Sequence, residues 1–205
     1  MKKTSSFLKF LIFLGLSFFI SQTAFAKGKL TLYCSVEIDV CEILVQAFEK
    51  ETGIDVAMTR KSSGETFAQI KAEGSNPKGD VWFGGTGDPH LTASQEGLTY
   101  EYKSIHFDDL LPAAQNQAIN GAFKTVGIYV GALGFGYNKD IIKSKGLPEP
   151  KSWADLTNPV YKGEIQVANP NSSGTAYTTL ATILQIFGEE KGWEYMKALH
   201  QNINQ

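Results

Sequence analysis

Short blocks of apolar and polar residues alternate along the chain and predict strands and helices in turn. Residues 30–33, 54–58 and 80–83 are apolar runs with the length of buried strands. Between them, residues 40–50 and 64–73 repeat apolar side chains every three or four positions, as amphipathic helices do. This alternation predicts a parallel, doubly wound α/β sheet.

The middle of the chain changes character at a glycine-punctuated apolar run, residues 126–137. Glycines at this density favour two extended segments with close backbone approach over a helix. Residues 148–159 predict a loop around a short turn at 153–156. The remaining predicted elements are helices at residues 91–96, 110–119, 174–187 and 189–200, and a strand at 163–168.

The first 26 residues predict a secretory signal peptide. Three lysines flank the start of an apolar stretch at residues 10–20, and Ala24-Phe25-Ala26 is a small-x-small cleavage site. The stretch is too short to span a bilayer, which disfavours the alternative of an uncleaved anchor. No cysteine follows it at a position for lipid attachment. The mature chain is therefore expected to begin near Lys27 and to be free in the periplasm.

The charge balance excludes a nucleic-acid role. The chain has 19 basic and 21 acidic residues, and three of the lysines precede residue 27, which leaves 16 against 21 and a net charge of −5. No basic cluster is present in the sequence. Proteins that bind nucleic acid need such a cluster to neutralise phosphates, so none is expected as a partner.

Two cysteines, Cys34 and Cys41, are the whole cysteine content of the chain. An even number at short spacing in an oxidising compartment predicts a disulfide between them. A metal pair is a weaker alternative because no histidine lies nearby, and a catalytic thiol is weaker still.

Three polar, glycine-bearing segments lie where a predicted strand should end and a helix begin: residues 59–65, 84–90 and 169–177. Free backbone N–H groups and the positive end of the helix dipole make such junctions anion-binding sites. In parallel sheets, ligands bind beyond the carboxyl ends of the strands, where these segments fall. Three of them together predict a receptor for a small anionic or metal-bearing ligand.

The same segments carry a resemblance to a known family. Residues 79–90, from Gly79-Asp80-Val81-Trp82-Phe83 to His90, are similar to the periplasmic substrate-binding proteins of ABC importers, in the group that includes ferric-iron, thiamine, phosphonate and sugar-phosphate binders. Residues 60–64, 134–138 and 169–177 resemble the same family in the same order. The resemblance spans nearly the whole mature chain.

This resemblance implies a two-lobed, type II periplasmic-binding-protein fold with doubly wound sheets. The corresponding organisation is a signal peptide at residues 1–26, an N-terminal α/β lobe at 27–125, hinge or crossover strands at 126–138, and a second α/β lobe at 139–205. Family members are usually well over a hundred residues longer. We therefore expect the second lobe to be truncated in this chain, and ligand residues to exist beyond Gln205.

The resemblance also implies capture of a ligand by a monomer, delivery to a membrane permease powered by a separate ATPase, and no chemistry or cofactor of its own. Ferric-binding members supply a histidine after the first strand and a glutamate after the third, and here those places hold Glu37 and Gly85. Glu37 remains a candidate metal ligand, but one carboxylate makes a weak site. We therefore favour a phosphate-bearing anion. The alternatives are ferric ion with a synergistic anion, as transported ligand, and thiamine.

The candidate ligand residues are those of the serine-glycine junctions and their neighbours. They are Ser35, Arg60, Ser62, Ser63, Gly64, Gly85, Thr86, Ser172, Ser173, Gly174 and Thr175. Arg60 is the only arginine, and a guanidinium can pair with phosphate through two hydrogen bonds, although a solvated cation at a strand end is an equal alternative. Tyr129, on the predicted hinge, is a candidate to face the cleft.

An enzyme is not expected. The three histidines show no metal-ligand spacing, and no nucleophile–base pair accompanies them. Asp88 and His90 are two residues apart, so on a helix they would point in different directions. A secreted enzyme acting on a phosphorylated metabolite is the rival class that remains.

Overall fold

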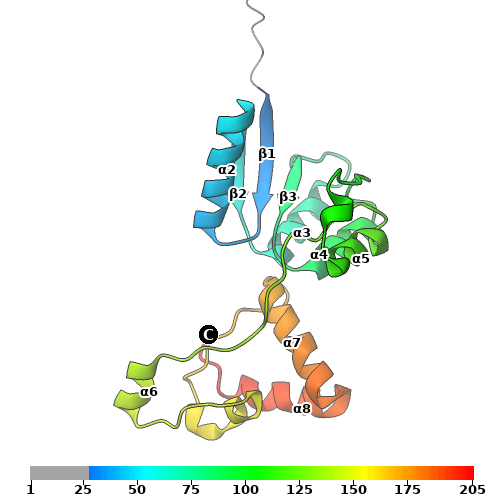
Figure 1. The fold of residues 1–205 in the computed structure, drawn as a ribbon. Coiled ribbons are helices and arrows are strands. Elements are labelled where there is room, and N and C mark those ends of the chain that lie inside the picture. Colours follow the sequence, from blue (N-terminus) through cyan, green and yellow to red (C-terminus); the bar gives the residue numbers. More distant parts are fainter. Residues whose placement is uncertain (1–27) are drawn as a thin grey trace, which may run out of the picture.

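The computed structural model describes residues 28–205, so the predicted signal peptide lies outside the described residues. The chain forms a first region at residues 28–125 and a second region at 139–205, and we call residues 126–138 the crossing segment (Figure 1). Within residues 28–205, none of the helices combines the length and apolar character that a membrane span requires.

The first region is built on three parallel strands in the order β2-β1-β3. They are β1 at Lys29–Cys34, β2 at Asp55–Arg60 and β3 at Val81–Phe83. The strand register pairs Cys34 with both Arg60 and Phe83, so the three strands end side by side. The residues that follow each strand are thereby brought to one edge of the sheet.

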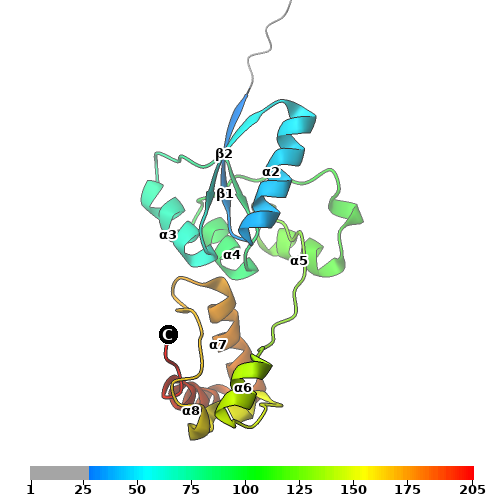
Figure 2. The same ribbon diagram turned by 90° about the vertical axis from the view of Figure 1, so that its left-hand side faces the viewer.

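Helices cover both faces of this sheet. Helix α2 (Ile38–Thr52) lies on one face, and α3 (Ser63–Glu73) and α4 (Gly87–Gln95) lie on the other (Figure 2). Helix α2 ends at Gly53, whose φ of 71° is the left-handed conformation that favours glycine at this position. The predicted doubly wound α/β architecture is confirmed here.

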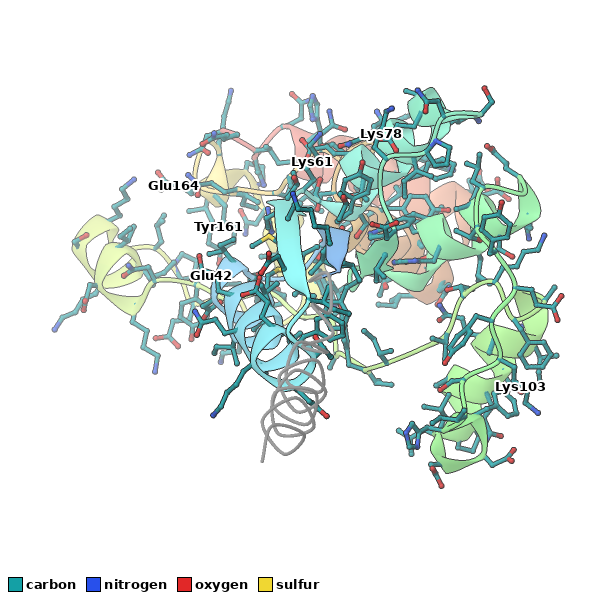
Figure 3. The ribbon with its side chains drawn as sticks, turned by 90° about the horizontal axis from the view of Figure 1, so that it is seen from above. Glu42, Lys61, Lys78, Lys103, Tyr161 and Glu164 are labelled. Atoms are coloured by element: carbon teal, nitrogen blue, oxygen red, sulfur yellow. A yellow bond between two sulfur atoms is a disulfide. The ribbon has the colours of Figure 1, made fainter. Side chains whose placement is uncertain are left out.

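A helical layer closes the first region beside β3. A 3₁₀ turn, η1 (Phe107–Asp109), precedes helix α5 (Pro112–Asn120), close to the predicted helix at 110–119. The Lys103 ammonium, labelled in Figure 3, lies 4.7 Å from the centroid of the Phe107 ring. Phe107 in turn packs edge-on against Phe123.

The crossing segment contains no strand, so the two extended strands predicted in this run are a wrong prediction. Its apolar residues have β propensity, but a strand also needs a hydrogen-bonding neighbour, and among the described residues none pairs with it. Several of its side chains are exposed, including Val130 at 74%. The segment runs as a single irregular connection between the two regions (Figure 1).

The second region begins with helix α6 (Lys139–Lys145), which the sequence interpretation missed. The Asn138 side chain caps it by accepting hydrogen bonds from the N–H groups of Asp140 and Ile141, and Gly146 ends it with a φ of 63°. This Asn-to-Gly spacing is a helix signal of its own. Two 3₁₀ turns follow, η2 (Trp153–Thr157) and η3 (Pro159–Tyr161).

Helices α7 (Gly174–Phe187) and α8 (Glu189–His200) begin and end as predicted and pack together at the second region's core. That core consists of Ile183, Tyr195 and Leu199, which are nearly or fully buried. The Tyr195 hydroxyl donates a hydrogen bond to the carbonyl of Trp153, and burial raises its pKa to about 12.

The strand predicted at residues 163–168 is reduced to an isolated parallel bridge between Ile165 and Ile203. Asn204 N–H donates to the Ile165 carbonyl, and Ile165 N–H donates to that of Asn202. The prediction of a full strand was wrong because only the few residues after α8 lie alongside this segment within the described chain.

Candidate functional site

Three helices begin at one place between the two regions: α3, α4 and α7. The first two follow β2 and β3, whose carboxyl ends lie at the same sheet edge, and α7 comes from the second region (Figure 2). The contacts described below join Ser62–Gly64, Gly85–Thr86 and Ser172–Gly174, which are the serine-glycine junctions that the sequence singled out. We call this convergence the three-helix site.

Backbone contacts join α3 to the segment before α7. The N–H of Gly64 donates a 3.0 Å hydrogen bond to the carbonyl oxygen of Ser172, and the Ser62 hydroxyl lies 2.6 Å from the same oxygen. A Cβ atom on Gly64 would lie 2.7 Å from the carbonyl oxygens of both Asn171 and Ser172. Only glycine therefore allows the two regions to approach this closely.

The start of α4 is held against both other helices. Thr86 N–H donates to the hydroxyl of Ser63, a buried side chain, at 3.2 Å. A Cβ atom on Gly174 would lie 2.3 Å from Thr86 Oγ1 and 2.9 Å from Ser63 Oγ. Thr86 Oγ1 is buried and has no hydrogen-bond partner within residues 28–205. A buried hydroxyl of this kind costs free energy unless something accepts or donates to it.

Helices α4 and α7 begin at this place with backbone N–H groups that the helix itself does not bond. The first residues of α4 (Gly87 and Asp88) and of α7 (Gly174 and Thr175) have no carbonyl one turn earlier within the helix to bond. No side chain caps α4, and α7 has a single cap, in which the Ser173 hydroxyl oxygen accepts a hydrogen bond from the N–H of Ala176. Together with three helix dipoles, these donors create a positive potential without a cluster of cationic side chains.

At α3 the cap is reciprocal. Ser62 and Glu65 form a capping box, in which the Glu65 carboxylate accepts the Ser62 N–H at 3.1 Å. The hydrogen bonds from the Ser62 side chain and backbone lower the pKa of Glu65. Ser62 and the N–H of Gly64 are therefore already engaged, so of the α3 residues only Ser63 keeps a hydroxyl that faces both other helices.

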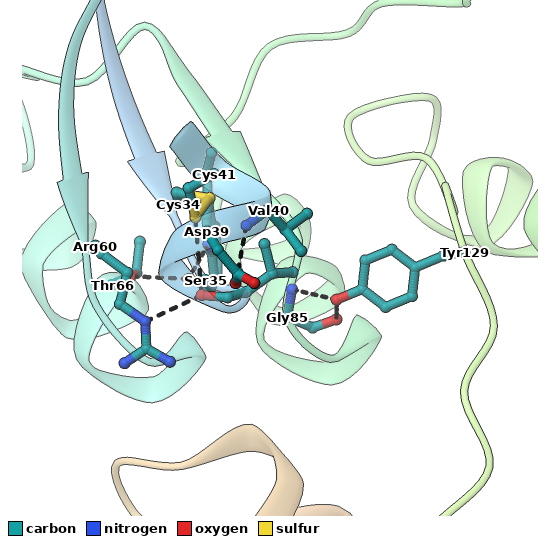
Figure 4. Close-up of a disulfide and its surroundings, with 11 residues drawn as sticks. Cys34, Ser35, Asp39, Val40, Cys41, Arg60, Thr66, Gly85 and Tyr129 are labelled. Carbon is teal, nitrogen blue, oxygen red and sulfur yellow. Dashed lines mark hydrogen bonds between the residues drawn. A yellow bond between two sulfur atoms is a disulfide. The ribbon is translucent and has the colours of Figure 1, made fainter. Parts of the chain in front are cut away.

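Arg60 lies at the carboxyl end of β2, beside this site (Figure 4). Its Nε donates a 3.0 Å hydrogen bond to the carbonyl of Val36, which holds the exposed side chain over the loop after β1. Its two terminal nitrogens extend beyond the end of the sheet in Figure 4. The predicted disulfide between Cys34 and Cys41 is present and ties the end of β1 to α2 behind this loop.

Ser35 is placed differently from expectation. Its hydroxyl is buried, accepts a 2.9 Å hydrogen bond from Trp82 Nε1 and lies 3.1 Å from Thr66 Oγ1. The N-cap position of α2 is occupied by Glu37. Ser35 thus orients Trp82 inside the first region rather than offering its side chain to the cleft.

The rings of Trp82 and His90 stack on each other, a contact that the sequence did not predict. Their ring centroids are 3.6 Å apart, and His90 Nε2 lies 2.8 Å from the carbonyl oxygen of Gly84. Because a carbonyl only accepts, Nε2 must carry the proton. Desolvation by burial lowers the pKa of His90, against an opposing contribution from this hydrogen bond. His90 therefore supports the Gly84–Gly85 turn as a neutral imidazole.

Tyr129 reaches the site from the crossing segment, as its place in the sequence suggested. Its hydroxyl is 2.7 Å from the N–H and 2.8 Å from the carbonyl oxygen of Gly85 (Figure 4). A groove of about 950 Å³ lies alongside β3 and the crossing segment. It reaches the three-helix site at Gly85–Gly87.

The metal candidate stands apart from any cluster of ligands. Glu37 is exposed, and its side chain makes no capping hydrogen bond to α2. Within the described residues, no three side chains of histidine, cysteine, aspartate or glutamate come together as a metal site would need. The residues that the structure does bring together carry hydroxyl and N–H donors, which suit an oxyanion.

Comparisons with known proteins agree with this architecture. The sequence model of the family described as "Bacterial extracellular solute-binding protein" matches residues 85–205. A Haemophilus influenzae protein of unknown role is 43% identical over 187 residues, which cover 91% of this chain and 54% of that protein. The phosphoglycerate transport regulatory protein PgtC of Salmonella typhimurium is 27% identical, over 55% of this chain and 30% of its own.

Among solved structures, the periplasmic binding protein AfuA from Actinobacillus pleuropneumoniae, with exogenous fructose-6-phosphate bound, is similar to this chain. The two are 43% identical with a TM-score of 0.83, over 88% of this chain and 57% of AfuA. The chain thus spans little more than half the length of these two more similar proteins.

Proposed function

Because the chain belongs to the bacterial extracellular solute-binding proteins, we propose that it captures a sugar phosphate between its two regions for import. Membership confirms the resemblance drawn from the sequence. The family is one of binding proteins that serve transport, so the expectation that the chain is no enzyme is confirmed at the level of the family.

The observation that carries the ligand class is the convergence of three helix N-termini with hydroxyl donors from Ser63 and Thr86. A phosphate group offers several anionic oxygens, which such N–H and hydroxyl donors bind through charge-assisted hydrogen bonds of about 1.5–3 kcal/mol each. The Thr86 hydroxyl has no partner among the described residues, and the terminal nitrogens of Arg60 are further donors beside the site. AfuA with fructose-6-phosphate bound, at 43% identity, makes a hexose phosphate the best-supported member of this class.

Both regions contribute helices to the site, and this explains how a ligand would be captured. The first region holds α3 and α4, and the second holds α7, so a phosphate bound by all three favours the arrangement in which the regions meet. A ligand shifts such an equilibrium only by its differential affinity for the closed state. Residues 126–138 are then the hinge, between lobes at 27–125 and 139–205.

The cellular setting belongs to the same proposal. The signal-like residues 1–26 support secretion of the mature chain into the periplasm, and AfuA is a periplasmic binding protein. Its partners are the small phosphorylated ligand and the membrane permease and ATPase subunits of an ABC importer. The protein binds as a monomer.

Ferric ion with a synergistic anion is the second candidate, and thiamine a third. The three-helix site would hold the synergistic anion of a ferric site. The one predicted metal ligand, Glu37, is exposed and belongs to no group of three potential metal ligands among the described residues. Sugar phosphate therefore has the stronger support.

A ligand panel on the full-length protein tests this proposal. We expect titration calorimetry to detect fructose 6-phosphate or glucose 6-phosphate, with fructose giving no heat and inorganic phosphate binding more weakly. Recovery of the unchanged sugar phosphate after hours of incubation excludes the rival enzyme. Tight ferric binding without sugar-phosphate binding would overturn the proposal in favour of the second candidate.

Gly64→Ala tests whether closure matters. The added Cβ would overlap two carbonyl oxygens of the second region, and overpacking of this size costs about 1–3 kcal/mol, so we expect affinity to fall about tenfold to a hundredfold. The fold of the first region should be unharmed because alanine favours helix. The matched control is Gly134→Ala, whose added Cβ meets nothing within 4 Å. Equal affinity of both variants would contradict closure at this contact.

A further inference from the structure

The crossing segment touches the three-helix site through one side chain, Tyr129. Its hydroxyl accepts a hydrogen bond from the N–H of Gly85 at 2.7 Å and donates one to the carbonyl of the same residue at 2.8 Å. One side-chain hydroxyl thus satisfies both the backbone donor and the backbone acceptor of Gly85.

The backbone conformation of Gly85 requires such a restraint. Its φ of +89° is a conformation that residues with a side chain rarely adopt, and the preceding Gly84 has a φ of +78°. Two consecutive glycines of this kind have many alternative conformations when nothing restrains them. On its other side, the position of a Gly85 Cβ would lie 2.2 Å from Ser63 Oγ, so the backbone is packed directly on α3.

The position of Gly85 decides where the next residues point. Thr86 is the N-cap of α4, and its N–H and hydroxyl both lie at the three-helix site. A shift of Gly85 therefore moves the Thr86 donors and the first turn of α4. His90 holds the Gly84 carbonyl from inside the region, which leaves the outer side of the turn to Tyr129.

We propose that Tyr129 is a positioning residue for anion binding: it fixes the Gly84–Gly85 turn so that the donors of Thr86 and α4 are aimed at the ligand. This inference rests on the proposed function, which places the phosphate at the three-helix site. It adds that the crossing segment does more than connect the regions. Since Tyr129 is carried by that segment, movement of the segment and order of the binding turn are coupled.

The exposure of Tyr129 argues against a role in the core. Its side chain is 51% exposed, so burial supplies little reason for an aromatic residue here. Tyr137, on the same segment, is the natural comparison, because its hydroxyl also donates a hydrogen bond, at 2.9 Å, to Glu149 of the second region and not to a residue of the three-helix site.

The test compares Tyr129→Phe with Tyr137→Phe in the full-length protein. Each variant keeps its ring and loses only a hydroxyl. We expect Tyr129→Phe to weaken fructose 6-phosphate binding about tenfold, from the loss of two hydrogen bonds, with the melting temperature of the ligand-free protein within about 2 °C of the original. Hydrogen exchange of the Gly85 and Thr86 amides should accelerate at least about fivefold. Tyr137→Phe should change neither quantity.

The measured affinity, amide exchange and melting temperature together test the role of Tyr129. Unchanged affinity in Tyr129→Phe, or unchanged exchange at Gly85, overturns the inference. A fall in melting temperature that accompanies and accounts for the loss of affinity also overturns it, because the role would then be structural. If the original protein binds no sugar phosphate, the proposed function is wrong, and so is the role of Tyr129 as a positioning residue for that ligand. Faster exchange at Gly85 in Tyr129→Phe would then still show that the contact orders the turn.

Discussion

The two regions contribute to the same site by different physical means. The first region positions α3 and α4 through a parallel sheet, whose register brings the ends of β1, β2 and β3 to one edge. The second region positions α7 through helix packing around Ile183, Tyr195 and Leu199, with a single isolated β-bridge nearby. Backbone hydrogen bonds thus place two helix N-termini, and side-chain burial places the third.

This difference predicts that the two halves of the site fail under different changes. A ladder of backbone hydrogen bonds does not depend on any one side chain. A small core does, because each buried side chain is a large share of the apolar surface removed from water.

The largest effect is expected from Ile183→Ala in α7. Ile183 is fully buried in the second region's core, and such truncations cost about 2–5 kcal/mol in the free energy of unfolding. Ile186→Ala is the matched control, since that side chain on the same helix is 53% exposed and should cost less than about 1 kcal/mol. Urea unfolding followed by tryptophan fluorescence measures both. Similar losses in the two variants would mean that α7 is not placed by this core.

Removal of the disulfide should destabilise the other region by a somewhat smaller amount. Cys34 and Cys41 close a short loop, so Cys34→Ser/Cys41→Ser should lose about 2–3 kcal/mol through the greater freedom of the unfolded chain. Hydrogen exchange should accelerate in β1 and α2 and stay unchanged in α7 and α8. Equal acceleration in both regions would show that they unfold as one unit, which would break the comparison.

Mild acid should produce the smallest effect, and it should act through His90 in the first region. Burial lowers the pKa of His90 below its ordinary value of 6.5, so the unfolded state binds the proton more readily than the folded state. Stability is therefore complete above about pH 6.5 and falls as the pH drops from there through the lowered pKa of the folded protein.

His90→Gln isolates this contribution, because an amide keeps a donor for the Gly84 carbonyl without titrating. Its thermal unfolding, recorded from pH 7.5 to 5, should show a weaker dependence on pH than that of the original protein. The lowered pKa of Glu65 acts in a lower window, as the pH falls below about 4.5, and does not interfere. Identical pH profiles would rule out His90 as the source.

Local pattern was sufficient for most of the helices and for the parallel sheet. Helices α7 and α8 were predicted to the residue: Ser173 caps the start of α7, and Gly188 separates the two helices. Helix α6 was missed although Asn138 and Gly146 flank it, because its seven residues are too few to show a clear period. The strands predicted in the crossing segment and at 163–168 failed because strand propensity has no effect without a neighbour to pair with.

The site residues also fall into those that the local sequence predicted and those that it did not. The serine-glycine junctions were recognisable from the sequence since their composition alone marks the start of a helix that can bind an anion. That Ser35 turns inward to Trp82, or that His90 stacks on the same ring, depends on side chains brought together by the fold.

The sequence by itself determined most of the helices, the serine-glycine segments at which three of them begin, and which family the chain resembles, because these properties depend on residues close together in the chain. Only the tertiary structure decided that the three helix starts meet, that Gly64 and Gly174 lie close to the facing helix starts, and that the Tyr129 hydroxyl bonds the backbone of Gly85. Contacts between residues 44 to 110 positions apart leave no periodic trace in the chain, because they depend on where the sheet and the crossing segment direct it.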